Sequence, residues 1–203
     1  LLFAVLGLFL SFAYVAPPFS FKKRGLGELT VFVVWGPLMT GVVFYVMIGR
    51  LDLGLDSLVA LIPGVFLSTI PYGLTVTTVL FGKHIDKLAA DKAKSIHTLP
   101  VILGEPLARK AVMLLMISFY PLIFLLVWAK ILGIGVLIVV LGLPYLIKSL
   151  RVYNSPRPET PGALYYVGWS FYHNRVVGGL FFLGLIVNVV LESVSRGITI
   201  LQI

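Results

Sequence analysis

The sequence predicts an all-α, polytopic transmembrane helix bundle, and three observations lead to this fold class. Hydrophobic residues make up 59% of the 203 residues, charged residues only 12%, and the mean hydropathy is +1.05, whereas soluble domains carry roughly 25% charged residues. The apolar residues form runs close to the roughly 20 residues that cross a hydrocarbon core. These runs lack the alternation of barrel strands, and only helices or closed barrels satisfy the backbone in lipid.

Six apolar segments qualify as spans of a single domain covering residues 1–203. The fifth is short and is expected to extend toward Leu132 and Leu150, and prolines at 37, 63, 71, 121 and 144 predict kinks. The segments are Leu1–Phe19, Leu29–Ile48, Leu58–Phe81, Ala111–Trp128, Ile134–Ile147 and Tyr165–Leu191. Because Leu1 lies inside an apolar run without an initiator Met or a basic leader, we expect an N-terminally truncated chain.

The basic residues are distributed unevenly between the loops. The first, third and fifth loops and their flanks hold 12 Lys and Arg, whereas the second loop, the fourth loop and the tail hold 3. The positive-inside rule therefore places the odd-numbered loops in the cytoplasm. The same rule explains the net charge of +8 without nucleic acid as a partner, and the absence of cysteine excludes disulfides and thiolate metal sites.

The third loop, with the sequence GKHIDKLAADKAKSIHTLPVILGE, is the most polar stretch of the chain. One interpretation is a solvated loop with topogenic lysines, but that leaves two carboxylates at a membrane exit unexplained. The other interpretation is a site for a diphosphate bound together with Mg²⁺. Asp86 and Asp91 supply carboxylate oxygens, which Mg²⁺ prefers as ligands alongside phosphate oxygens. Positive charge for the remaining diphosphate oxygens is expected from Lys22 and Lys23 in the first loop and from Lys83, Lys87, Lys92, Lys94 and His97 in the third.

This loop resembles the later Asp-rich motif of the UbiA superfamily of intramembrane prenyltransferases. The matching positions are Asp91, Lys92, Thr98, Leu99, Pro100, Val101, Leu103 and Gly104. The stretch YVAPPFSFKKRGLGELTVFVVWGPLMTGVVFYVMIG, from Tyr14, is also similar to the family's Tyr-x-x-Pro-Pro, Gly-Leu-Gly-Glu and Gly-Pro-Leu segments. The resemblance covers most of residues 14–104.

The resemblance implies that the six segments are spans four to nine of nine. The family's first Asp-rich motif would then be absent, and the 203 residues alone are expected to lack half of the metal site and to be inactive. One departure concerns the later motif, whose carboxylates are usually four residues apart. Asp86 and Asp91 are five apart, or about 140° around a regular helix, so we expect Asp91 to be the stronger metal ligand and Asp86 the weaker.

The last span opens with polar residues, which are costly in a membrane and usually face a bundle interior. We expect His173 and Asn174 to line an acceptor pocket and Arg175 to lie near the diphosphate, although Arg175 is also placed to snorkel to the interface. Tyr14, Tyr72 and Tyr172 are candidates to stabilise, with their ring faces, the allylic cation that forms when a diphosphate leaves. The enrichment of tyrosine at membrane–water interfaces also explains such residues.

The resemblance implies Mg²⁺-dependent transfer of a prenyl group from a polyprenyl diphosphate to an aromatic acceptor in the cell membrane, with lipid around the bundle and the Asp-containing loop in the cytoplasm. The stretch from Gly25 to Gly49 is most similar to the branch that prenylates dihydroxynaphthoate for menaquinone. Hydroxybenzoate, a tetrapyrrole and a lipid alcohol remain open as acceptors. The alternatives are a multi-span transporter with a midplane site and a non-catalytic membrane scaffold. A transporter would not need ionisable groups concentrated at one membrane face.

Overall fold

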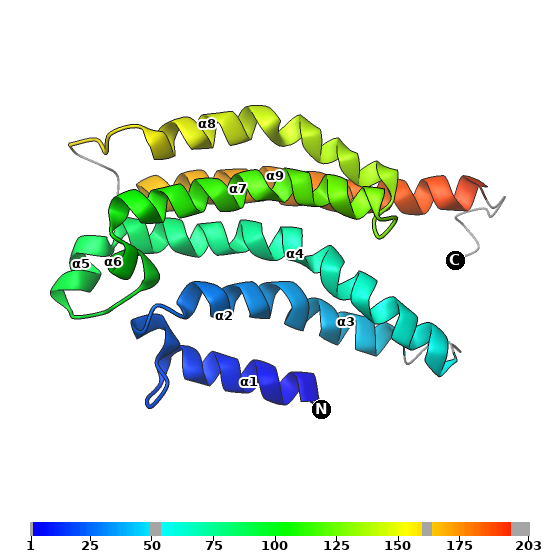
Figure 1. Ribbon diagram of the computed structural model, residues 1–203, viewed down its shortest axis with the longest axis horizontal. Coiled ribbons are helices and arrows are strands. Elements are labelled where there is room, and N and C mark those ends of the chain that lie inside the picture. Colours follow the sequence, from blue (N-terminus) through cyan, green and yellow to red (C-terminus); the bar gives the residue numbers. More distant parts are fainter. Residues whose placement is uncertain (1, 49–53, 160–163, 196–203) are drawn as a thin grey trace.

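The computed structural model describes residues 2–48, 54–159 and 164–195. In these ranges the regular elements are helices that run along one long axis (Figure 1), which confirms the all-α class. The elements are α1 (Leu2–Val15), η1 (Phe21–Lys23), α2 (Gly27–Val33), η2 (Val34–Leu38), α3 (Met39–Ile48), α4 (Leu55–Asp86), α5 (Leu88–Ala93), α6 (Leu99–Leu103), α7 (Glu105–Trp128), η3 (Ile134–Gly142), α8 (Leu143–Asn154) and α9 (Tyr165–Ser195).

Five helical stretches in the described residues are long and apolar enough to cross a membrane, and they correspond to the second to sixth predicted spans. Their bounds are Gly27–Ile48, Val59–Asp86, Glu105–Trp128, Ile134–Asn154 and Tyr165–Ser195. The first predicted span forms the shorter apolar helix α1, apart from Leu1, which lies outside the described residues. The chain is therefore a multi-pass membrane protein built as a helix bundle.

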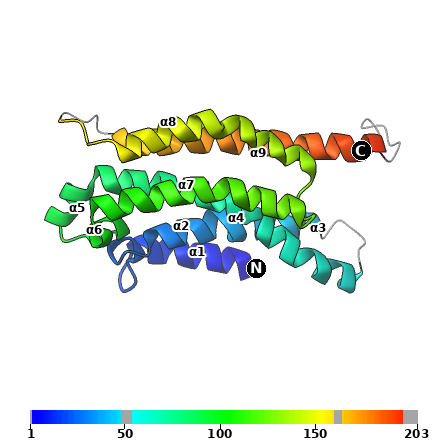
Figure 2. The ribbon, with the colours of Figure 1, turned by 45° about the horizontal axis from the view of Figure 1, so that its top comes forward.

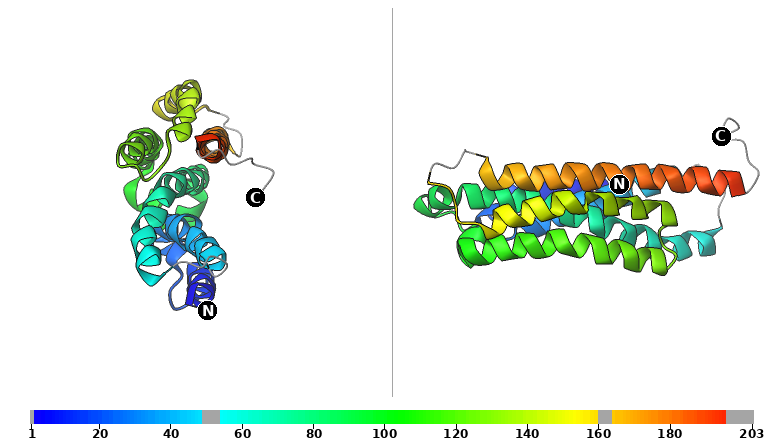
Figure 3. Two further views of the ribbon diagram at one scale, coloured as in Figure 1. Left: turned by 90° about the vertical axis from the view of Figure 1, so that its right-hand side faces the viewer. Right: turned by 90° about the horizontal axis from the view of Figure 1, so that it is seen from above.

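The helices form an extended array rather than a closed ring. Seen along the long axis, α7, α8 and α9 lie at one end of the array, α4 lies in the middle, and α2, α3 and α1 follow in turn (Figure 3, left). The buried core lies mainly between α4, α7, η3 and α9. Many large apolar side chains elsewhere are exposed, among them Leu8, Trp128 and Val194, as expected for a surface solvated by lipid.

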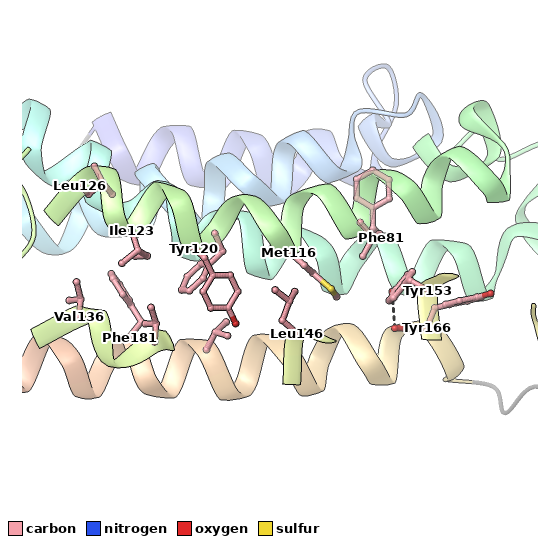
Figure 4. Close-up of a cluster of buried hydrophobic side chains, with 14 of the residues drawn as sticks. Phe81, Met116, Tyr120, Ile123, Leu126, Val136, Leu146, Tyr153, Tyr166 and Phe181 are labelled. Carbon is pink, nitrogen blue, oxygen red and sulfur yellow. Dashed lines mark hydrogen bonds between the residues drawn. The ribbon is translucent and has the colours of Figure 1, made fainter. Parts of the chain in front are cut away.

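One face of α7 supplies the middle of the core. Val112, Met116, Tyr120 and Ile123 recur at helical spacing and are buried. Figure 4 shows Met116, Tyr120 and Ile123 lying between α7 and the pair formed by η3 and α9. This packing fixes α7 against α9 along most of their shared length.

Four of the five prolines for which the sequence predicts kinks lie inside helices, and Pro144 lies in the first turn of α8. Pro37 lies in η2, a π-helical turn, which accommodates a residue without a backbone N–H. Helix α4 continues through Pro63 and Pro71 and bends along its length (Figure 1). Pro121 lies inside α7 and is exposed, where its missing hydrogen bond faces away from the core.

Gly82 brings the end of α4 against the start of α9. A Cβ at this position would lie 2.8 Å from Val167 Cα and 2.9 Å from the carbonyl oxygen of Tyr166. Any larger residue would force the two backbones apart. The glycine therefore places the last turn of α4, including Asp86, beside the first turn of α9.

The basic loops lie at one end of the bundle. Figures 1 and 2 show the turn after α1, the short helices α5 and α6, and the start of α9 at the same end. The ends of α3, α7 and α9 lie at the other end. The unequal distribution of lysine and arginine thus corresponds to the two ends of the bundle.

Candidate functional site

The first and third loops meet at the basic end. The backbone N–H of His97 donates to the carbonyl of Lys23 at 3.2 Å, and Arg24 and His97 form an isolated parallel bridge. This contact joins two predicted diphosphate-binding segments through residues that are 74 positions apart in sequence. Of the residues predicted to bind the diphosphate in these loops, Lys22 is half-buried, and the exposed ones are Lys23, Lys83, Lys87, Lys92, Lys94 and His97.

Asp91 lies on α5 and has a free carboxylate oxygen. The residue is only 8% exposed, and its Oδ2 is buried with no hydrogen-bond partner among the described residues. A buried carboxylate oxygen without a donor is costly unless a cation or a proton satisfies it. Of the two predicted metal ligands, Asp91 is therefore the one with a carboxylate oxygen available to a metal ion.

Asp86 has a different environment. Its Oδ1 accepts the backbone N–H of Tyr166 at 3.0 Å, and its Oδ2 accepts that of Val167 at 2.9 Å. These N–H groups belong to the first turn of α9, where the helix itself provides no acceptor. The Asp86 carboxylate thus caps α9 from another helix, and its negative charge also suits the positive end of the helix dipole.

Arg157 holds this cap in place from the segment between α8 and α9. Its guanidinium lies 3.6 Å from Asp86 Oδ1 and 3.3 Å from Glu105 Oε2. Glu105 also accepts the hydroxyl of Tyr166 at 3.3 Å, and Arg109 donates to the carbonyl of Tyr153 at 2.6 Å. The resulting network ties α4, α7, α8 and α9 together at the basic end.

Asp86 and Asp91 lie on different helices. Helix α4 ends at Asp86 and α5 begins at Leu88, so the helix breaks at Lys87, between the two aspartates. In the described ranges, no group of three or more His, Asp or Glu side chains is close enough to hold a metal ion. Asp86 has its oxygens occupied by protein donors, whereas Asp91 does not.

The donor set fits a magnesium ion that arrives with a diphosphate. Mg²⁺ is usually held by one or two protein carboxylates, with phosphate and water oxygens filling its octahedral shell. Asp91 Oδ2 supplies such a ligand, and the surrounding lysines supply charge for oxygens that the metal leaves free.

A buried acid–imidazole pair lies between α2 and α4, and sequence reasoning missed it. His84 Nδ1 is 2.7 Å from Glu28 Oε1, and the side chains are 1% and 2% exposed. Glu28 Oε2 and His84 Nε2 have no partner among the described residues. The available signal was that Glu28 ends the Gly-Leu-Gly-Glu segment, but nothing in the sequence pairs it with a residue 56 positions later.

A cavity of about 560 Å³ brings together three of the residues predicted to bind substrate. Tyr72 lines it from α4, and Asn174 and Arg175 line it from α9. His173 instead is fully buried next to Tyr120 of α7, their ring centroids 6.3 Å apart. Tyr14 lines a separate groove of about 300 Å³, which Leu10, Ser11, Thr30, Val31, Val34 and Trp35 complete.

A multi-pass bundle with a carboxylate and several basic side chains at one end, and a partly polar cavity between its spans, defines the class of this protein as a polytopic membrane protein with a polar site at one end. The UbiA prenyltransferase family model matches residues 1–175. The chain belongs to the UbiA prenyltransferase family, as its two motifs predict. Family membership favours prenyl transfer over the transporter and scaffold alternatives.

One curated relative is the 2-carboxy-1,4-naphthoquinone phytyltransferase of Synechocystis sp. (strain ATCC 27184 / PCC 6803 / Kazusa). The two sequences are 26% identical over 144 residues, which are 71% of this chain and 44% of the relative. The chain therefore matches less than half of the relative's length. No solved structure matches the chain significantly.

Proposed function

We propose that the protein transfers a prenyl group from a polyprenyl diphosphate to a naphthoquinone-type aromatic acceptor, in its reduced form, during quinone biosynthesis. The observation that carries the proposal is the free, buried carboxylate oxygen of Asp91 beside the basic loops of a UbiA-family bundle. The naphthoquinone substrate in the relative's name supports the acceptor class. The menaquinone branch is the specific assignment that the stretch from Gly25 to Gly49 favours.

In the proposed reaction, the allylic C–O bond of the donor breaks and its electron pair leaves on the diphosphate. An electron-rich ring carbon of the acceptor forms the new C–C bond and then loses its proton or its carboxyl group, which restores the aromatic ring. Asp91 would hold the Mg²⁺ ion, and this ion would supply positive charge for the leaving group. Lys22, Lys23, Lys92, Lys94 and His97 are close to the same end and stabilise the remaining negative charge.

The intramembrane residues orient the two organic groups. Tyr72 is placed to shield the allylic cation with its ring from the wall of the cavity. Tyr14 is placed for the same role from the groove between α1 and α2. Asn174 supplies an amide to the cavity, and its Oδ1 has no partner among the described residues. The bundle excludes water from the cation, which would otherwise be hydrolysed.

The test of this function is product formation in detergent or nanodiscs with Mg²⁺, a polyprenyl diphosphate and reduced 1,4-dihydroxy-2-naphthoate. The full natural protein should be used for this test. The 203 residues alone are expected to give no product, since we propose that further carboxylates complete the metal site. Turnover by the 203 residues alone would show that the two-motif arrangement does not apply here.

We propose that the protein lies in the cytoplasmic membrane with the Asp91 end facing the cytoplasm. The chain has no cysteine, so a thiol reagent can label only the single cysteine that is introduced. Ser20→Cys and Ser95→Cys should resist an impermeant thiol reagent added to sealed cells and react after permeabilisation. Ala129→Cys, in the exposed turn after α7 at the other end, is the matched control and should react from outside. The opposite pattern would reverse the orientation.

A further inference from the structure

The cavity between α3, α4 and α9 has a polar end that the proposed reaction does not fully use. Tyr72, Asn174 and Arg175 form this end, and Met39, Phe181 and Leu185 contribute to the apolar remainder. Arg175 belongs to none of the ion pairs found among the described residues. The cavity therefore presents a guanidinium and an amide with no protein anion beside them.

Arg175 lies within the last span rather than in a loop. Asp86 caps α9 at Val167, and Arg175 follows eight residues later, about 12 Å further into the span at 1.5 Å per residue. Arg175 therefore lies inside the span, and its side chain is exposed at the cavity. Ionisable side chains at such depth are rare and usually mark a substrate path or a ligand.

The shape and chemistry of this polar end fit a planar carboxylate. A guanidinium donates two parallel N–H groups to a carboxylate, a pairing that lysine does not reproduce. Gly178 and Gly179 leave the wall of α9 without side chains. The Tyr72 ring packs near Gly178, whereas nothing lies within 4 Å of the position that a Cβ on Gly179 would take. A flat ring can therefore approach the helix beside Tyr72.

Resting on the proposed function, we propose that this polar end recognises the carboxylate of an aromatic acid acceptor, with Arg175 as the residue that determines this specificity. A prenyl tail has no group that would pair with a guanidinium. The donor's diphosphate is held at the basic end of the bundle, near Asp91.

The test compares two acceptors that differ only in the carboxylate, 1,4-dihydroxy-2-naphthoate and 1,4-dihydroxynaphthalene, both kept reduced. Arg175→Gln should raise the KM of the acid about 10- to 100-fold, the range expected for lost hydrogen bonds to a charged group. The KM of the neutral acceptor and that of the prenyl diphosphate should stay within about twofold of wild type. Arg175→Lys should recover part of the preference for the acid over the neutral acceptor, because lysine keeps the charge but not the two parallel N–H donors of the guanidinium.

Arg151→Gln, an exposed arginine near the end of α8, is the matched control and should leave the two acceptors' KM values unchanged. Equal KM increases for both acceptors, or an increase confined to the donor, would overturn the assignment. If the wild-type protein forms no product with either acceptor, the proposed function fails separately. Calorimetric binding of 1,4-dihydroxy-2-naphthoate without donor then decides the site, since binding unaffected by Arg175→Gln would refute it. If Arg175→Gln does not fold, Arg175→Lys and Asn174→Leu provide the same comparison.

Discussion

Asp91→Asn should lower kcat at least a hundredfold while leaving the folded protein as stable as wild type. The carboxylate oxygen Oδ2 has no protein partner among the described residues, so its replacement by an amide breaks no internal hydrogen bond there. A lost metal-bridging contact in a partly dry site costs several kcal/mol of transition-state stabilisation, and about 1.4 kcal/mol corresponds to a factor of ten. Steady-state rates across a magnesium titration measure the effect.

A weakened metal site is partly rescued by high magnesium, so the Asp91→Asn deficit should shrink as the ion concentration rises. Asp56→Asn is a suitable control, because Asp56 is an exposed carboxylate in the first turn of α4 at the other end of the bundle. A small loss that does not depend on magnesium would assign the third loop to the solvated, topogenic role instead.

The large features of the fold were predictable because the membrane imposes them. Apolar runs of span length located the helices, and the placement of lysine and arginine correctly grouped the first, third and fifth loops at one end. The contact between His97 and Lys23 follows from this grouping. These patterns depend on composition and length, which a single sequence contains in full.

The rotation of each helix about its own axis was not predictable. Helix α9 is apolar on most of its surface, so its sequence contains no stripe that distinguishes a lipid-facing side from an interior one. Successive residues point about 100° apart. His173 therefore packs beside Tyr120, while Asn174 and Arg175 line the cavity, although all three were expected to bind substrate.

The long-range polar contacts could also not be predicted from the sequence. The bond between Glu28 and His84 spans 56 positions, and that between Asp86 and Tyr166 spans 80. No local spacing encodes either pair. The one-residue displacement of Asp86 from the family's spacing did indicate that it differs from Asp91, and the structure shows its oxygens occupied by backbone donors. This difference leads to distinct expectations for the two aspartates.

Asp86→Asn should reduce stability more than it reduces catalysis. The carboxylate is 3% exposed and accepts two backbone N–H groups at the start of α9. An amide offers one acceptor oxygen and presents an NH₂ group to the other N–H, so one donor becomes buried without a partner. Losing a helix cap costs about 0.5–2 kcal/mol, and an unsatisfied buried group adds about 1–3 kcal/mol. We expect the free energy of unfolding to fall by about 2–4 kcal/mol.

Unfolding of the detergent-solubilised protein in a denaturant titration measures this loss, with Asp56→Asn on the same helix as the control. The remaining folded protein should keep a rate within about ten- to a hundredfold of wild type, the range for residues that act through a neighbour of the metal. That rate should not respond to added magnesium, because the cap does not contact the ion. An Asp86→Asn protein of wild-type stability, whose slow rate recovers at high magnesium, would instead place Asp86 among the metal ligands. Its two backbone contacts would then have to break when the diphosphate binds.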